Sequence, residues 1–248
     1  MGRILVTGSS GCIGRAVVAA LTRRGHPVRG FDRVAGPALP EFVAGSITDP
    51  AAVDRAMEGV RCLVHLAATP DDAPFTTELL PNNLLGVHHV LESARRAGVG
   101  RMILASSGQV SWWQGQRGEF PVRPEDPPTP KSWYAATKLF LEGIGRSFAE
   151  DHGISVITVR LGWCPRTAAQ RREIADTPWA QDVYLSPGDA GRFFACAVEA
   201  PETVRHLVVY AASRCRFQEA FDRAAARDLL GFEPHDTWPE GLEDGLEE

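Results

Sequence analysis

The sequence predicts an α/β fold, in which a doubly wound parallel sheet carries a small C-terminal lobe. Short apolar runs rich in β-branched residues alternate with amphipathic stretches along the chain. A glycine-studded turn joins the first strand directly to the first helix. The chain has 248 residues, 44% of them hydrophobic, which suits one domain with a large core. Together these observations favour a parallel sheet with helices on both faces.

The expected elements follow one another in a regular order. Strands are expected at 3–8, 27–33, 62–68, 101–107, 155–162 and 206–213. Helices are expected at 14–26, 82–98, 133–150 and 187–201, and a proline-rich surface loop at 120–132. We expect residues 1–248 to form a single domain, to which 161–248 contribute a small substrate-binding lobe.

Composition limits the classes of partner. The net charge is −5 and no basic run is interleaved with aromatic residues, so we expect neither nucleic acid nor an anionic membrane as a partner. No stretch approaches the roughly 20 apolar residues of a membrane helix, and a strand begins at residue 3 in place of a leader, which favours a cytoplasmic protein. The cysteines form no CxxC pair, so neither a disulfide frame nor a metal site is expected.

The turn after the first strand predicts a dinucleotide site. Gly8 allows a tight turn, Gly11 lets the backbone approach a pyrophosphate, and Gly14 permits close packing at a helix N-terminus. Asp32 ends the second strand, where a carboxylate accepts ribose hydroxyls and repels a 2′-phosphate, so NAD is favoured over NADP. Arg33 leaves NADP open, because an arginine can hold a phosphate. The alternative is an ordinary tight turn before a core helix.

A second set of residues predicts hydride-transfer chemistry. Tyr134 and Lys138 are four residues apart and therefore share one face of a helix. The chain has only two lysines, Lys131 and Lys138, and an ammonium one turn from a phenol favours its deprotonated form. Ser107 ends a strand at the carboxyl edge of the sheet, where it can hold a reacting oxygen. The alternative is a helix tyrosine with an incidental lysine.

The glycine spacing GxxGxxG resembles that of the short-chain dehydrogenase/reductase superfamily. "HLAA", "NNLLG", "ASS" and the Tyr134–Lys138 pair resemble its extended branch, the epimerase/dehydratase family, from residue 3 to about residue 235. The resemblance implies a Rossmann-like fold, NAD as cofactor, and Ser107, Tyr134 and Lys138 as the catalytic residues. The cofactor-binding residues that it implies are Gly8, Gly11, Cys12, Ile13, Gly14, Asp32, Arg33, Ser46, Ile47, Ala67, Ala68, Asn83, Tyr134 and Lys138. Ser46 stands where the family commonly has aspartate.

The residues after Ser107 narrow the reaction. A dehydratase of this family needs an acid and a base there, whereas this chain has Gly108 and Gln109, which do not exchange protons at neutral pH. "ASSGQV", "VRLGWCP" and "LLGFEP" resemble uronate dehydrogenases, which implies oxidation of a sugar, a uronic acid or a small polyol. The implied substrate-binding residues are Pro70, Ser107, Gln109, Trp112, Trp163 and Arg171. Pro70, Gln109 and Trp163 depart from that pattern, and Arg171 is expected to clamp a carboxylate unless it is a solvated loop residue.

Two other functions stay open at this point. A nucleotide-sugar epimerase would use the same residues, although it calls for a larger C-terminal lobe. A non-catalytic protein that senses NAD(P) would need the glycine turn but not Tyr134. The helices at 82–94 and 133–150 carry apolar residues on more than one face, which together with the resemblance predicts a homodimer.

Overall fold

The computed structural model describes residues 2–36 and 39–242. Within these residues seven parallel strands form one sheet in the order β3-β2-β1-β4-β5-β6-β7. The strands are β1 Arg3–Thr7, β2 Val28–Asp32, β3 Glu41–Ala44, β4 Val60–His65, β5 Arg101–Ser107, β6 Ser155–Leu161 and β7 His206–Ala211. The chain reverses its direction across the sheet between β1 and β4, and ligands of such folds bind outside the strand ends at this point. The predicted doubly wound fold is confirmed.

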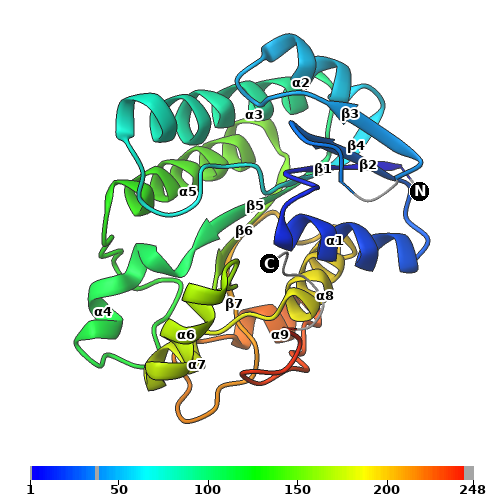
Figure 1. The fold of residues 1–248 in the computed structure, drawn as a ribbon. Coiled ribbons are helices and arrows are strands. Elements are labelled where there is room, and N and C mark those ends of the chain that lie inside the picture. The colour runs from blue at the N-terminus through cyan, green and yellow to red at the C-terminus, as the bar shows by residue number, and fades with distance from the viewer. Residues whose placement is uncertain (1, 37–38, 243–248) are drawn as a thin grey trace.

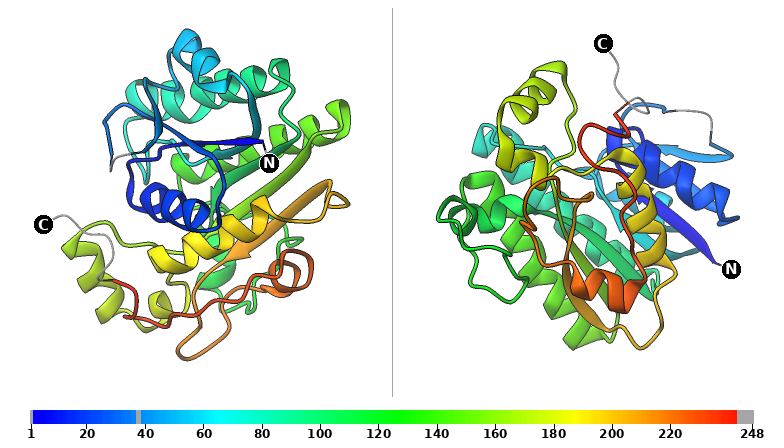
Figure 2. Two further views of the ribbon diagram at one scale, coloured as in Figure 1. Left: turned by 90° about the vertical axis from the view of Figure 1, so that its right-hand side faces the viewer. Right: turned by 90° about the horizontal axis from the view of Figure 1, so that it is seen from below.

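Helices cover both faces of the sheet, as Figures 1 and 2 show. One face carries α1 (Cys12–Arg23), α8 (Pro187–Val198) and α9 (Ala224–Leu230). The other carries α2 (Pro50–Met57), the π-helix η1 (Phe75–Leu85), α3 (Gly86–Arg96) and α5 (Trp133–His152). The 3₁₀ helix η2 (Gly108–Ser111) directly follows β5. The short helices α4 (Trp112–Gln116), α6 (Ala168–Asp176) and α7 (Pro178–Asp182) lie together at one end of the molecule in Figure 1.

Alternation along each central strand builds the two halves of the core. In β1, Ile4 and Val6 point into the cluster that includes α1 and α8, whereas Leu5 points into the cluster that includes α2, α3 and α5. Successive side chains of a strand face opposite sides, so a strand buried on both faces is a continuous apolar run. This arrangement explains why the apolar runs of the sequence locate the central strands.

Local structure departs from the expectations at several places. Strand β3, at Glu41–Ala44, was not expected, because four residues at a sheet edge give too short a pattern. The helix expected from residue 82 begins at Phe75 and continues through Pro81 as a π-helix. Helices α6 and α7 lie between β6 and α8, where the sequence predicted no helix. The short helices α2 and α4 were not expected either.

Residues 163–185 leave the sheet after β6 and return to the same point. At the base of this excursion the Trp163 N–H donates to the carbonyl of Val183 over 2.6 Å, and the Leu185 N–H donates to the carbonyl of Trp163 over 3.0 Å. The excursion holds α6 and α7, whereas β7 and α8, which follow it, belong to the main sheet layers. The segment after β6 therefore supplies both part of the core and a separate outer structure.

Candidate active site

A cavity of about 910 Å³ lies at the carboxyl ends of β1, β2 and β4. Of the residues expected to bind a cofactor, it is lined by Gly8, Gly11, Cys12, Ile13, Gly14, Asp32, Arg33, Ser46, Ile47, Ala67, Ala68, Tyr134 and Lys138. Asn83 does not line the cavity. The volume lies within the range of protein sites for small molecules and cofactors.

The glycine turn forms one wall of this cavity. Gly8 has a φ of 72°, and a Cβ built on Gly14 would lie 2.0 Å from the carbonyl oxygen of Gly8, so neither position accepts a side chain without movement. A Cβ on Gly11 would meet only that same oxygen, at 3.5 Å. No side chain caps the N-terminus of α1, which leaves its first N–H groups to an anion. The turn thus fits the pyrophosphate of a dinucleotide.

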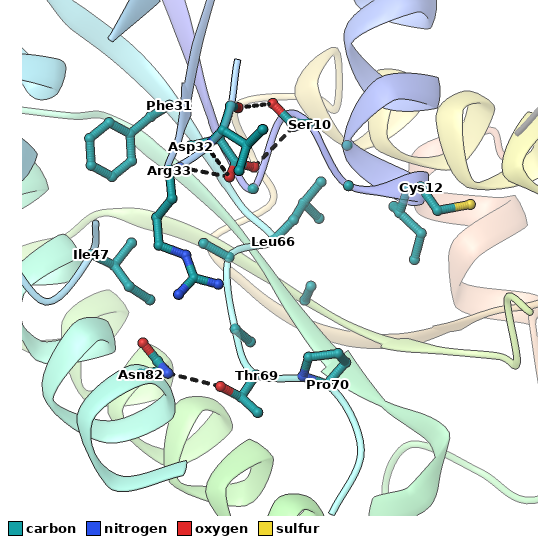
Figure 3. Close-up of a pocket in the computed structure, with 18 of the residues that line it drawn as sticks. Ser10, Cys12, Phe31, Asp32, Arg33, Ile47, Leu66, Thr69, Pro70 and Asn82 are labelled. Carbon is teal, nitrogen blue, oxygen red and sulfur yellow. Dashed lines mark hydrogen bonds between the residues drawn. The ribbon is translucent and has the colours of Figure 1, made fainter. Parts of the chain in front are cut away.

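Asp32 ends β2 beside the glycine turn, as Figure 3 shows. Its carboxylate accepts hydrogen bonds from the N–H groups of Ser10 (3.0 Å) and Arg33 (2.7 Å). A carboxylate has about four acceptor positions, so the ribose hydroxyls of a dinucleotide can bind as well. The Arg33 side chain extends past Ile47 into the cavity in Figure 3. An acceptor and a cation therefore stand side by side where the adenosine ribose of a dinucleotide binds.

Asn83 positions the loop after β4 instead of lining the cavity. Its Oδ1 accepts from the Thr69 N–H over 2.8 Å, and its Nδ2 donates to the Thr69 carbonyl and to the Thr137 hydroxyl. Thr137 lies on α5 beside Lys138. The amide thus ties the cavity loop to the helix that carries Tyr134. Its neighbour Asn82 lines the cavity instead.

Tyr134 lies where this cavity meets a second one, of about 530 Å³. Helix α5 begins at Trp133 because the Ser132 hydroxyl caps it by accepting from the Ala135 N–H, and Asp72 accepts from the Tyr134 N–H. Lys138 lies on the side of the first cavity and Ser107 on the side of the second. The fold therefore brings the three predicted catalytic residues together.

Burial dominates the protonation of Tyr134 and Lys138. It raises the pKa of Tyr134 to about 12, and the negative charge of Asp71 acts in the same direction, whereas a hydrogen bond with Ser107 opposes both. Burial lowers the pKa of Lys138 to about 8. The Lys138 ammonium donates to the carbonyl of Ala105 over 2.9 Å. The phenolate is thus less favoured here than the lysine alone led us to expect.

A buried polar network supports the site from behind. Glu142, two turns after Tyr134 on α5, pairs with Arg160 of β6 over 2.9 Å and accepts from the Ser106 hydroxyl over 2.5 Å. Arg160 also donates to the Tyr210 hydroxyl, which bonds to Ser111 of η2. The network joins α5, β5, β6 and β7, and it fixes the distance between the strand end at Ser107 and the helix at Tyr134.

The second cavity holds most of the expected substrate residues. Pro70, Ser107, Gln109, Trp112 and Trp163 line it, whereas Arg171 does not. The Arg171 guanidinium instead donates to the carbonyl of Leu242 over 3.2 Å, so the predicted carboxylate clamp points toward the C-terminal segment. Arg171 is thus separated from the other expected substrate residues, although its neighbours Gln170 and Glu173 on α6 line the cavity.

Sequence reasoning missed the charged pair of the second cavity. Arg166 lines both cavities and forms an ion pair with Asp71, which also accepts a hydrogen bond from Gln170 over 3.3 Å. Asp71 has a φ of 60°, a conformation that aspartate tolerates better than most side chains. The only signal in the sequence was the turn-forming "PDD" after the third predicted strand.

Two cysteines meet at the border of the cavities. The Sγ atoms of Cys12, the first residue of α1, and Cys164, which follows β6, lie 4.0 Å apart. The hydrogen bond from Cys164 lowers the pKa of Cys12 to about 7, although burial acts in the opposite direction.

Within residues 2–36 and 39–242, no three His, Cys, Asp or Glu side chains are grouped as metal ligands. No helix of this described part is long and apolar enough to cross a membrane.

Known proteins share this combination of features. The model of the NAD dependent epimerase/dehydratase family matches residues 4–163. An L-arabinose 1-dehydrogenase (NAD(P)(+)) of Haloferax volcanii is 31% identical over 96% of this chain and 98% of its own length. A mutated uronate dehydrogenase of known structure superposes with a TM-score of 0.79 at 29% identity, over 100% of this chain and 87% of that chain. A mutant of the uronate dehydrogenase of Agrobacterium tumefaciens in complex with NAD superposes with a TM-score of 0.78 at 26% identity, over 95% of this chain and 85% of that chain.

The doubly wound sheet, the glycine turn and the Ser107, Tyr134 and Lys138 set at the strand ends define a protein of the short-chain dehydrogenase/reductase class. Within that class one family can be identified, because its model matches well over half of the chain. The chain belongs to the NAD-dependent epimerase/dehydratase family.

Proposed function

We propose that the protein is an NAD-dependent oxidoreductase that oxidises a hydroxyl group of a sugar, a uronic acid or a related small polyol. One observation carries the proposal: Tyr134 lines both cavities, the cofactor-sized one and the smaller one beside it. A proton-transfer group at that junction lies next to both reactants. The dehydrogenase names of the similar proteins support the same reaction.

In the proposed reaction Ser107 holds the reacting substrate oxygen and Tyr134 accepts its proton. Bound NAD would supply the acceptor for the hydride on the carbon that bears this oxygen, so that the hydroxyl would become a carbonyl, with NADH and one proton as the other products. Lys138 is held beside Tyr134 by its hydrogen bond to the Ala105 carbonyl. Asp32 and the first N–H groups of α1 would hold the ribose and the pyrophosphate of NAD.

NADH formation tests the proposal. Purified protein is mixed with NAD and, one at a time, with aldoses, hexuronic acids and polyols, and Tyr134→Phe serves as the matched variant. We expect NADH with at least one compound, and loss of about 10²- to 10⁴-fold in rate in the variant. No NADH with any compound, or an unchanged rate in Tyr134→Phe, contradicts the proposal. An epimerase would instead interconvert sugars without net NADH.

We further propose a cytoplasmic homodimer of a single domain, to which residues 161–248 contribute a small substrate-binding lobe. Leu85 at the end of η1 and Phe140 on α5 are 50% and 42% exposed, and a second copy would cover them. Light scattering of the wild type and of Phe140→Glu tests the dimer. We expect the wild type to be a dimer and the carboxylate of Phe140→Glu to shift the protein toward monomer. A monomeric wild type contradicts the proposed dimer. The net charge of −5 supports a small molecule, not nucleic acid, as the partner.

A further inference from the structure

The second cavity carries a charged pair that the proposed reaction does not itself require. Arg166 and Asp71 come from two different loops and meet within the cavity, with side chains that are 35% and 49% exposed. We infer that this cavity selects a neutral aldose over a hexuronate, with Asp71 and Arg166 holding sugar hydroxyl groups. The inference rests on the proposed function and specifies its substrate.

The charge of Arg166 is already matched inside the protein. Its guanidinium donates to Asp71 Oδ2, and the amide groups of Gln170 (3.3 Å) and Gln109 (3.5 Å) approach the same carboxylate. A substrate carboxylate that approached Arg166 would meet the negative charge of Asp71 and would have to displace it. A hydroxyl group, by contrast, can donate to the carboxylate or accept from the guanidinium while the pair stays intact.

No other cation of the described residues is free to replace Arg166 in this cavity. Arg171 bonds to the carbonyl of Leu242 and lies outside the lining. Lys131 lines the cavity, but its ammonium lies 3.9 Å from the ring centroid of Trp112, in a cation–π contact. Among the lining side chains that the structure describes, the carboxylates Asp71, Asp72 and Glu173 outnumber the cations Lys131 and Arg166. The cavity is therefore unfavourable for an anion.

The remaining lining suits the uncharged part of a sugar. Trp112, Trp163 and Trp179 line the cavity. The rings of Trp112 and Trp179 pack edge to face, with their centroids 5.3 Å apart. Aromatic faces pack on the C–H groups of a sugar ring, whereas carboxylate and amide groups bind its hydroxyls. Ser107, Tyr134, Asp71 and Arg166 line the same cavity, and the charges of Asp71 and Arg166 act on Tyr134, so a sugar whose reacting hydroxyl meets Ser107 and Tyr134 would reach the pair as well.

Matched pairs of sugars test the inference. D-galactose is compared with D-galacturonate, and D-glucose with D-glucuronate, because each pair differs only at C6. We expect kcat/KM for the aldose to exceed that for the uronate by about tenfold or more. An equal or higher value for the uronate overturns the inference while it supports the proposed dehydrogenase. No NADH with any sugar or polyol overturns the proposed function, and the inference with it.

Asp71→Asn sharpens the test, because it keeps the shape of the side chain and frees the charge of Arg166. We expect this variant to raise the uronate-to-aldose ratio of kcat/KM by about tenfold. Glu173→Gln is the matched control, since it removes one negative charge from the same cavity without freeing Arg166. The double variant Asp71→Asn, Arg166→Gln should lose the gain. A ratio that changes equally in Asp71→Asn and Glu173→Gln, or in neither, refutes the role of the pair. Thermal unfolding reports that each variant is folded.

Discussion

The glycine turn gives a sharp quantitative prediction for Gly14→Ala. A Cβ at Gly14 would lie 2.0 Å from the carbonyl oxygen of Gly8, whereas real Cβ atoms essentially never approach a heavy atom within 3.0 Å. The N-terminus of α1 must therefore move by about 1 Å away from the turn. Charge-assisted hydrogen bonds contribute about 1.5–3 kcal/mol each, so misplacing one or two of them costs NAD binding about 3 kcal/mol. That loss corresponds to a roughly hundredfold increase in Kd.

Two further glycine variants separate the possible causes. A Cβ on Gly11 meets no protein atom closer than 3.5 Å, so Gly11→Ala should keep its stability but bind NAD more weakly, because the methyl group stands where the pyrophosphate approaches. Gly143 on α5 has open space around a built Cβ, so Gly143→Ala should raise the free energy of unfolding by about 0.5–1 kcal/mol and leave NAD affinity unchanged.

Titration calorimetry with NAD and thermal unfolding measure these effects. The expected order of NAD affinity is wild type and Gly143→Ala first, Gly11→Ala next, and Gly14→Ala last. Gly14→Ala should in addition lose about 1–3 kcal/mol of unfolding free energy through overpacking. Gly14→Ala protein that binds NAD within twofold of the wild type would refute the reasoning, because it would mean that α1 does not position the cofactor.

Other measurements probe protonation, the thiol pair and the buried network. The rate of oxidation should rise with pH from about pH 6 to about pH 9, because Tyr134 must lose a proton whose pKa burial raises; a rate that falls over this range contradicts its role as base. Cys12, whose pKa is about 7, should be alkylated by iodoacetamide at neutral pH, and NAD should protect it; equal rates with and without NAD would place it outside the cofactor site. Glu142→Leu leaves Arg160 buried without its carboxylate partner and should cost about 3–5 kcal/mol of stability in denaturant unfolding, whereas Glu119→Ala, which breaks an exposed ion pair with Arg117, should leave stability nearly unchanged; similar losses would refute this.

Much of the fold could be predicted from the sequence because the relevant signals are local. The central strands are buried on both faces and therefore appear as apolar runs, and the turn at Gly8 needs small residues at fixed positions. Strand β3 could not be predicted in this way, because an edge strand of four residues leaves no clear pattern. The π-helix also escaped, since Pro81 normally argues against a helix interior.

The substrate side was less accessible for a different physical reason. A strand end fixes the position of Ser107, and one helical turn separates Tyr134 from Lys138. Their places in the sequence were therefore enough to predict that they lie together. Arg166 and Asp71 are 95 residues apart in loops, and their contact depends on how those loops fold over the sheet. The sequence favoured Arg171 as the arginine that binds a substrate carboxylate. Neighbouring residues of a helix such as α6 point in different directions, however, so a position in the sequence does not show which of them faces the cavity.

The closed base of the 163–185 excursion bears on how this scaffold can be re-engineered. Its two ends are held side by side by backbone hydrogen bonds at Trp163, Val183 and Leu185, which do not depend on what lies between them. Arg166, Gln170, Glu173 and Trp179 all belong to it, so much of the polar wall of the second cavity is encoded in one continuous stretch of the gene. Exchanging that stretch as a cassette leaves the sheet, the glycine turn and the helix of Tyr134 in place, so a new selectivity can be introduced without redesigning the catalytic framework.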